Sequence, residues 1–124
     1  MSLKVLLVED DLRVREVLAA YLAVDGNEVT LAADGVEGLD LARSERPDFI
    51  VTDIMMPRMD GLAMVRTMRQ DTGLRQIPVL LISGHSDPPV ADELAGGPLG
   101  YIAKPVTLGG FLAAVHRLIK PQAA

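Results

Sequence analysis

The segment Leu3-Lys-Val-Leu-Leu-Val-Glu-Asp-Asp11 places three acidic residues directly after a short apolar run. A buried strand is expected over Leu3–Val8, because short apolar runs of this kind are typical of strands covered on both faces. The run Phe49–Val51 has the same character and continues into Thr52-Asp53. Both segments therefore indicate buried strands that end in carboxylates.

Strands and helices are expected to alternate outward from these two segments. Three further strands are expected at residues 29–32, 79–82 and 101–103. Apolar residues recur at helical spacing over residues 14–22, 34–43, 62–68 and 108–119, and a short helix is expected between Pro88 and Gly96. Five β-α units predict a parallel sheet covered on both faces.

The expected fold is an α/β, flavodoxin-like three-layer sandwich. Its five-stranded parallel sheet would have the strand order 2-1-3-4-5. A closed barrel of eight units would need about twice the length of this chain. We therefore expect one domain over residues 1–124, with its core at 3–120.

Composition excludes several classes of function. The 124 residues include no cysteine, which removes disulfide frameworks, thiolate metal sites and cysteine nucleophiles. The net charge of −5 and the 3% aromatic content argue against direct binding of nucleic acid. No apolar run approaches the roughly 18 residues that a membrane span needs. We expect a cytoplasmic protein.

Polar side chains follow four of the five predicted strands. Ligands of open parallel sheets bind beyond the carboxyl ends of the strands. The residues found there are Glu9-Asp10-Asp11, Asp53, Ser83-Gly84-His85 and Lys104-Pro105. The second strand is followed only by Ala32 and Ala33, and the predicted order places it at the edge. The four polar strand ends are therefore expected to be neighbours.

Such a cluster suits phosphoryl chemistry. Carboxylates held close together repel one another, and a divalent cation relieves that repulsion. Oxygen ligands favour Mg²⁺, with Mn²⁺ as a substitute. Lys104 adds a positive charge and Ser83 a hydroxyl donor, so the site could stabilise a transferring phosphoryl group. One carboxylate could carry that group as a mixed anhydride.

Simpler roles remain open for several of these residues. Asp10 and Asp11 precede a helix and can serve as N-caps. His116 lies near the end of the last helix, where the helix dipole favours a cation. His85 is either a loop residue, which we slightly favour, or a neighbour of the site. Core filling is the preferred interpretation of the methionines Met55, Met56, Met59, Met64 and Met68.

Four motifs together resemble the receiver domain of two-component response regulators. They are Val5-Leu-Leu-Val-Glu-Asp-Asp11, Asp53-Ile-Met-Met-Pro-Arg-Met-Asp-Gly61, Ser83-Gly84 and Tyr101-Ile-Ala-Lys104-Pro105. The combination is highly specific, and the resemblance runs from about residue 3 to residue 120. It implies a CheY-like fold and a signalling domain that is not an enzyme, beyond assisting its own phosphorylation and dephosphorylation.

The resemblance implies a phosphoacceptor and a magnesium site. Asp53 would accept a phosphoryl group from a phosphohistidine on a sensor histidine kinase or a histidine phosphotransfer protein. Asp10 would bind Mg²⁺ directly and Glu9 largely through water. Asp53 and the backbone carbonyl of Met55 would complete the protein ligands.

The resemblance also implies a switch. Ser83 and Lys104 would contact the phosphoryl group, and the bond from Lys104 to Pro105 would be cis. Tyr101 would rotate inward as Ser83 moves. Output would pass through the helix between residues 88 and 96, the strand that contains Tyr101, and the last helix. The downstream protein, or a missing output domain, is unknown.

Two departures from the family pattern matter. The run Gly96-Gly-Pro-Leu-Gly100 lacks the acidic pair that often precedes the switch aromatic, which argues against the charge-paired dimer of the winged-helix branch. We expect a monomer or a weak dimer. Met55 and His85 take site-flanking positions that tune phosphoryl lifetime in the family, and Met56 is a further candidate neighbour of the site.

Three other functions compete with the phosphorylation switch. A receiver-like docking module that works without phosphorylation is the main alternative, although such modules usually lose one of the key site residues. An aspartyl-phosphate phosphatase would need a second Asp where Met55 stands. A flavin carrier would place its phosphate against Glu9-Asp10-Asp11, which would repel it.

Overall fold

The computed structural model of the chain describes residues 3–84 and 97–119. Its strands are β1 (Lys4–Val8), β2 (Glu28–Ala32), β3 (Phe49–Asp53), β4 (Val79–Ser83) and β5 (Leu99–Ala103). Its helices are α1 (Leu12–Val24), α2 (Gly35–Glu45), α3 (Gly61–Arg69) and α4 (Leu108–Ile119). The helix expected between Pro88 and Gly96 lies outside the described residues.

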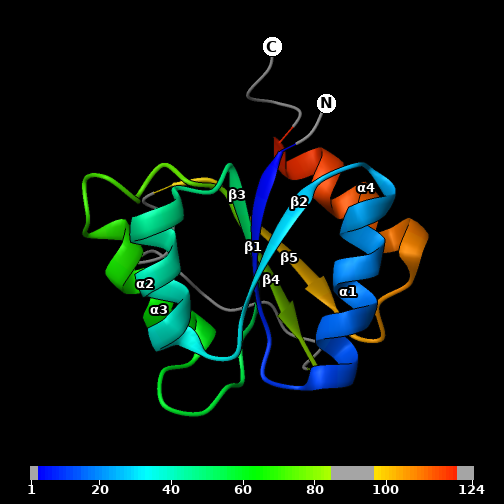
Figure 1. Ribbon diagram of the computed structural model, residues 1–124, viewed down its shortest axis with the longest axis horizontal. Coiled ribbons are helices and arrows are strands. Elements are labelled where there is room, and N and C mark those ends of the chain that lie inside the picture. Colours follow the sequence, from blue (N-terminus) through cyan, green and yellow to red (C-terminus); the bar gives the residue numbers. More distant parts are fainter. Residues whose placement is uncertain (1–2, 85–96, 120–124) are drawn as a thin grey trace.

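The five strands form one parallel sheet in the order β2-β1-β3-β4-β5, which confirms the predicted topology. Figure 1 shows α2 and α3 on one side of the sheet and α1 and α4 on the other. Every residue of β3 and β4 is buried, as expected for central strands covered on both faces. The result is a three-layer α/β sandwich.

Alternate residues of the strands build the two halves of the core. Leu6 and Val8 of β1 pack with Met64 and Met68 of α3 on one face of the sheet. On the other face, Val5 and Leu7 belong to the cluster that contains α1 and α4. The sheet is thus anchored from both sides and presents its strand ends in a fixed register.

Aspartates begin three of the helices. The Oδ1 atom of Asp11 accepts hydrogen bonds from the backbone amides of Arg13 and Val14, which confirms Asp11 as an N-cap. Asp34 and Asp60 cap α2 and α3 in the same way. Each cap satisfies amides that the first helical turn leaves without a partner. Asp10, the other proposed cap, does not take this role.

A buried arginine joins α3 to the start of β5. The guanidinium of Arg69 donates to the backbone carbonyls of Arg75, Ile77 and Pro98 at 2.8, 3.1 and 2.7 Å. A side chain at Gly97 would collide with the Arg75 carbonyl and with this guanidinium. The path of the chain into β5 therefore requires glycine at position 97. Strand β5 begins at Leu99, two residues earlier than predicted.

Two specific contacts join α4 to α1 and to Asp25, the C-cap of α1. The rings of Tyr21 and Phe111 lie 6.0 Å apart, and the ring Nε2 of His116 lies 2.8 Å from Asp25 Oδ2. His116 thus has a specific partner in addition to the helix dipole that was proposed for it. Among the residues described, no helix has the length and apolar character needed to cross a bilayer.

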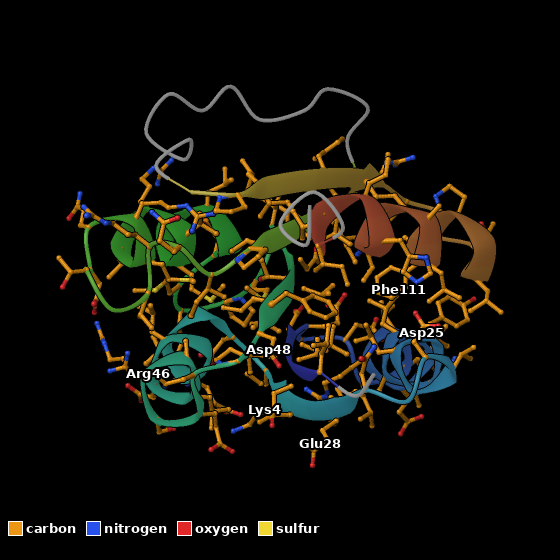
Figure 2. All side chains as sticks on the ribbon, turned by 90° about the horizontal axis from the view of Figure 1, so that it is seen from above. Lys4, Asp25, Glu28, Arg46, Asp48 and Phe111 are labelled. Atoms are coloured by element: carbon orange, nitrogen blue, oxygen red, sulfur yellow. The ribbon has the colours of Figure 1, made fainter. Side chains whose placement is uncertain are left out.

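The amino-terminal ends of the strands carry a polar rim. Figure 2 looks onto this end, where Lys4 and Asp48 lie side by side. The backbone amide of Lys4 donates to Asp48 Oδ2 at 2.8 Å, and its ammonium donates to the Glu45 carbonyl at 3.1 Å. These bonds join the start of β1 to the end of α2 and to Asp48, which directly precedes β3. They lie at the end of the sheet opposite the predicted site.

Several apolar residues are more exposed than their spacing predicted. Val17, Val36 and Leu108 face solvent, although each fits a helical apolar stripe. The core-filling interpretation holds for Met64 and Met68 but is wrong for Met55, whose residue surface is 64% exposed. Met55 lies in the loop between β3 and α3, where no layer of the sandwich covers it.

Candidate functional site

Three carboxylates meet at the carboxyl ends of β1 and β3. Glu9 and Asp10 follow β1, and Asp53 is the last residue of β3. The two strands are neighbours, with Val8 paired to Thr52, so their ends lie level. One carboxylate oxygen from each of the three residues lies within 4.8 Å of the others. The predicted acidic cluster is therefore present, with Glu9 and Asp53 buried and Asp10 exposed.

Glu9 is buried without full compensation. Its Oε2 atom accepts a hydrogen bond from the Asp11 amide at 3.1 Å, whereas its Oε1 atom is buried and has no hydrogen-bond partner. Burial raises the pKa of this carboxyl to about 7, the Asp11 amide opposes that rise, and the negative charge of Asp53 adds to it. A buried oxygen of this kind is suited to a cation, so the residues fit a metal site.

Asp53 is held by one bond on each oxygen. Its Oδ1 atom accepts from the Ile54 amide at 2.8 Å, and its Oδ2 atom accepts from the Lys104 ammonium at 3.1 Å. The ammonium nitrogen also lies 3.8 Å from Glu9 Oε1. Partial burial lowers the pKa of Lys104, but the hydrogen bond and charges of Asp53 outweigh it, and the pKa is raised overall. Lys104 is therefore a firmly charged partner for the acidic cluster.

The ends of β4 and β5 bring the remaining predicted residues alongside. Ser83 is buried at the end of β4, and its carbonyl accepts from the Lys104 amide at 2.7 Å. The peptide bond from Lys104 to Pro105 is cis. Tyr101 is partly buried on β5, opposite Leu81 of β4. His85 lies outside the described residues.

The loop from Asp53 to α3 folds back tightly on its own start. The Gly61 amide donates to the Ile54 carbonyl at 2.8 Å. A side chain at Gly61 would overlap the backbone carbonyl of Asp53, so this position requires glycine. Met55 projects into solvent from this loop, and Met56 is partly buried against the core. The close approach of two backbone segments thus explains Gly61, and the N-cap of α3 explains Asp60.

Sequence reasoning missed an ion pair beside this loop. Arg58 donates through Nε and Nη2 to Asp34 Oδ2, at 2.8 and 2.6 Å. The sequence pattern indicates only Ala32 and Ala33 after the second strand, whereas the structure shows that Asp34, the next residue, is the buried cap of the following helix. The pattern Asp34-x-x-Glu37 is a capping signature and could have identified that cap. No local pattern indicates that Arg58 is its partner.

Residues 5–116 match the family described as the response regulator receiver domain. The chain belongs to this family. It is 42% identical over 123 residues to the response regulator MprA of Mycobacterium tuberculosis strain H37Rv. That match covers 97% of this chain and 52% of the relative, so the chain spans about half the length of the curated relatives it matches.

Solved structures agree with this assignment. The chemotaxis response regulator CheY4 of Vibrio cholerae superposes with a TM-score of 0.86 at 32% identity, covering 95% of this chain and 99% of that one. The receiver domain of the sensor histidine kinase PA1611 of Pseudomonas aeruginosa gives 0.84 at 27% identity, covering 97% and 99%. That structure has a magnesium ion coordinated in its active-site cleft.

Family membership and geometry together define the site. The fold is CheY-like, and the domain is a signalling phosphoacceptor of two-component systems rather than an enzyme. The pocket formed by Glu9, Asp10 and Asp53 is typical of a receiver phosphoacceptor site and resembles the magnesium site of receiver domains. Membership also implies a cognate histidine kinase.

Proposed function

We propose that this chain is a phosphorylation switch in which Asp53 accepts a phosphoryl group from a phosphohistidine. The donor is a sensor histidine kinase or a histidine phosphotransfer protein. One observation carries the proposal: the Oδ2 atom of Asp53 lies 3.1 Å from the Lys104 ammonium, while two further carboxylates adjoin Asp53. A carboxylate placed between a fixed cation and a cation-binding cluster is suited to attack phosphorus.

The metal in this proposal is Mg²⁺, for which Mn²⁺ can substitute. The carboxylates of Glu9, Asp10 and Asp53 and the backbone carbonyl of Met55 would hold it. The Oε1 atom of Glu9 supports this ligand set, because it is buried without a hydrogen-bond partner and a cation would compensate for its burial. When bound, the ion would neutralise the carboxylates and the charge that develops on the phosphoryl oxygens.

In the transfer, an oxygen of the Asp53 carboxylate attacks phosphorus. A phosphorus–oxygen bond forms and the phosphorus–nitrogen bond to the donor imidazole breaks. The electron pair of that bond stays on the imidazole nitrogen, which takes up a proton. The Lys104 ammonium and the Ser83 hydroxyl bind the phosphoryl oxygens. The raised pKa of Lys104 keeps its charge available throughout this step.

Phosphorylation would then change the conformation of the surface around β5 and α4. Ser83 moves toward the phosphoryl group and Tyr101 rotates inward, which alters β5, α4 and the segment between β4 and β5. We propose that residues 1–124 act as one cytoplasmic domain with its core at 3–120. It works as a monomer or weak dimer on a downstream protein or an attached output domain.

Intact mass measurement tests the proposal. The protein is incubated with Mg²⁺ and acetyl phosphate, and then with a phosphorylated histidine phosphotransfer protein. A gain of about 80 Da is expected for the wild type. It should be absent from Asp53→Asn and from samples treated with a chelator.

Asp60→Asn is the matched control, because it alters a carboxylate in the same loop while keeping an N-cap oxygen for α3. This control should be phosphorylated normally. If the folded wild type gains no mass from either donor, the switch is wrong and the docking module that works without phosphorylation replaces it.

A further inference from the structure

The loop from Asp53 to α3 is tethered to a second helix through one ion pair. Both Nε and Nη2 of Arg58 donate to Asp34 Oδ2, while Asp34 Oδ1 accepts from the Glu37 amide at 2.9 Å. Asp34 therefore uses one oxygen as the cap of α2 and the other for Arg58. The Asp34 side chain is 9% exposed and that of Arg58 is 62% exposed, so the arginine reaches inward from solvent to a buried carboxylate.

The backbone beside Arg58 is pressed against the same helix. The Gly35 amide at the start of α2 donates to the Met59 carbonyl at 2.9 Å. A side chain at Gly35 would lie 2.5 Å from that carbonyl oxygen, so the glycine permits the close approach. The ion pair and this backbone bond hold adjacent residues of the loop, and together they set its distance from α2.

Arg58 itself has an unfavourable backbone. Its φ of +63° lies in the left-handed region that favours glycine. A non-glycine residue persists there only where surrounding contacts hold it. The two guanidinium bonds to Asp34 supply such contacts. The side chain therefore accounts for a conformation that the backbone alone would disfavour.

We propose that Arg58, held by Asp34, is a positioning residue for the phosphoacceptor loop, residues 54–60 between Asp53 and α3. The pair would fix the path of residues 54–60 and with it the Met55 carbonyl that completes the metal ligands. Neither Arg58 nor Asp34 belongs to the proposed ligand set. This inference rests on the proposed function, because it concerns how the same site is kept in its binding geometry.

Four variants separate this role from simple stability. Arg58→Gly removes the guanidinium but suits the left-handed backbone, and Arg58→Lys keeps the charge without the two-pronged contact. Asp34→Asn keeps one oxygen for the helix cap and turns its amide group toward Arg58. The double variant of Arg58→Gly with Asp34→Asn tests whether the two residues act as a pair.

Arg43→Ala is the matched control. It breaks another ion pair between α2 and a loop, because Arg43 Nε lies 3.8 Å from Asp71 Oδ2. That pair is on the exposed surface, and Asp71 lies beyond the end of α3 rather than in the phosphoacceptor loop. Any loss of affinity caused by handling or by general loosening of α2 should appear in this variant as well.

The readout is affinity for Mg²⁺ by calorimetric titration, together with the phosphorylation rate from acetyl phosphate as a function of Mg²⁺ concentration. Arg58→Gly and Asp34→Asn should each weaken Mg²⁺ binding about three- to tenfold, the lower part of the range for residues that orient metal ligands. Arg58→Lys should fall between them and the wild type. The double variant should bind Mg²⁺ no less tightly than the single variant with the lower affinity. Saturating Mg²⁺ should restore most of the phosphorylation rate in all of these variants.

Two results would overturn the inference. Wild-type Mg²⁺ affinity in a folded Arg58→Gly protein would show that the loop holds its geometry without the pair. An equal loss of affinity in Arg43→Ala would show that the effect is not specific to this loop. If the wild type itself bound no Mg²⁺, the proposed function would fail first, and that outcome is distinct because it does not depend on any variant.

Discussion

Glu9 and Asp34 are both buried carboxylates near the carboxyl ends of neighbouring strands, yet their surroundings are opposite. The amide of Glu37 lowers the pKa of Asp34 by binding its oxygen, and Arg58 lowers it further. Burial raises the pKa of Glu9 to about 7, and one of its oxygens has no hydrogen-bond partner. A satisfied carboxylate stabilises the fold, whereas an unsatisfied one keeps binding capacity for a cation. This difference distinguishes Asp34, which has a structural role, from Glu9, for which we propose metal binding, just beyond the ends of two adjacent strands.

The largest effect that tests this comparison is on metal binding. Glu9→Gln should weaken Mg²⁺ binding about 10- to 100-fold, because it replaces a carboxylate of the acidic cluster by a neutral amide. Asp34→Asn should cause a clearly smaller loss. Calorimetric titration of both variants checks the order. Equal losses at the two positions would show that Glu9 and Asp34 do not differ in metal binding.

The second effect is on the pH dependence of stability without metal. The folded state retains a proton on Glu9 that the unfolded chain releases, so stability should fall as pH rises from about 4.5 through about 7. The expected loss is on the order of 2 kcal/mol. Urea unfolding midpoints in chelator at pH 5 and pH 8 measure it.

Glu9→Gln is the control for that slope, since an amide does not titrate. This variant should be nearly flat over the same pH interval and more stable than the wild type at pH 8. Asp34 predicts the opposite sign in a lower window: because its pKa is depressed below 3.8, the stability it contributes is lost as pH falls through its folded-state pKa. A wild-type profile that rises from pH 5 to pH 8 would contradict the state inferred for Glu9.

The third effect is the stability carried by Asp34. Asp34→Ala removes both the α2 cap and the acceptor for Arg58, and should lower the free energy of unfolding by about 1–2 kcal/mol. Asp34→Asn keeps a cap oxygen and should cost less. Chemical denaturation at pH 7 distinguishes the two. If the alanine variant were as stable as the wild type, Asp34 would not be the structural acid of the pair.

The smallest effect concerns the ion pair of Arg43 and Asp71. Its atoms lie 3.8 Å apart on the surface, where solvent screens the charges. Arg43→Ala should change the free energy of unfolding by less than about 0.5 kcal/mol. Thermal unfolding checks this value. A larger loss would mean that charge alone, rather than burial with complete hydrogen bonding, explains the contribution of Asp34.

The strand ends could be predicted because they depend on local patterns. Short apolar runs followed by Glu9, Asp53, Ser83 or Lys104 are visible in the sequence, and parallel topology places their ends together. The cluster of Glu9, Asp10 and Asp53 and the contact of Lys104 with Asp53 follow from that rule. The four motifs that resemble a receiver domain then correctly indicated the family.

Features that depend on nonlocal packing could not be predicted. Sequence alone does not show that Glu9 is buried while Asp10 is exposed, because both follow the same strand. The Arg58 contact joins positions 24 residues apart through a left-handed backbone that arginine rarely adopts. Helical spacing predicted that Val17 lies on the buried face of α1, whereas its side chain is exposed to solvent in the structure.

The contact between Tyr21 and Phe111 has a practical consequence for spectroscopy. The chain has no tryptophan and two tyrosines, so its near-ultraviolet signal comes mainly from Tyr21, packed between α1 and α4, and Tyr101, on β5. Tyr21→Phe keeps a ring against Phe111 and leaves Tyr101 as the sole phenol. In that variant, absorbance and emission become a built-in optical reporter of one strand, with no dye attached.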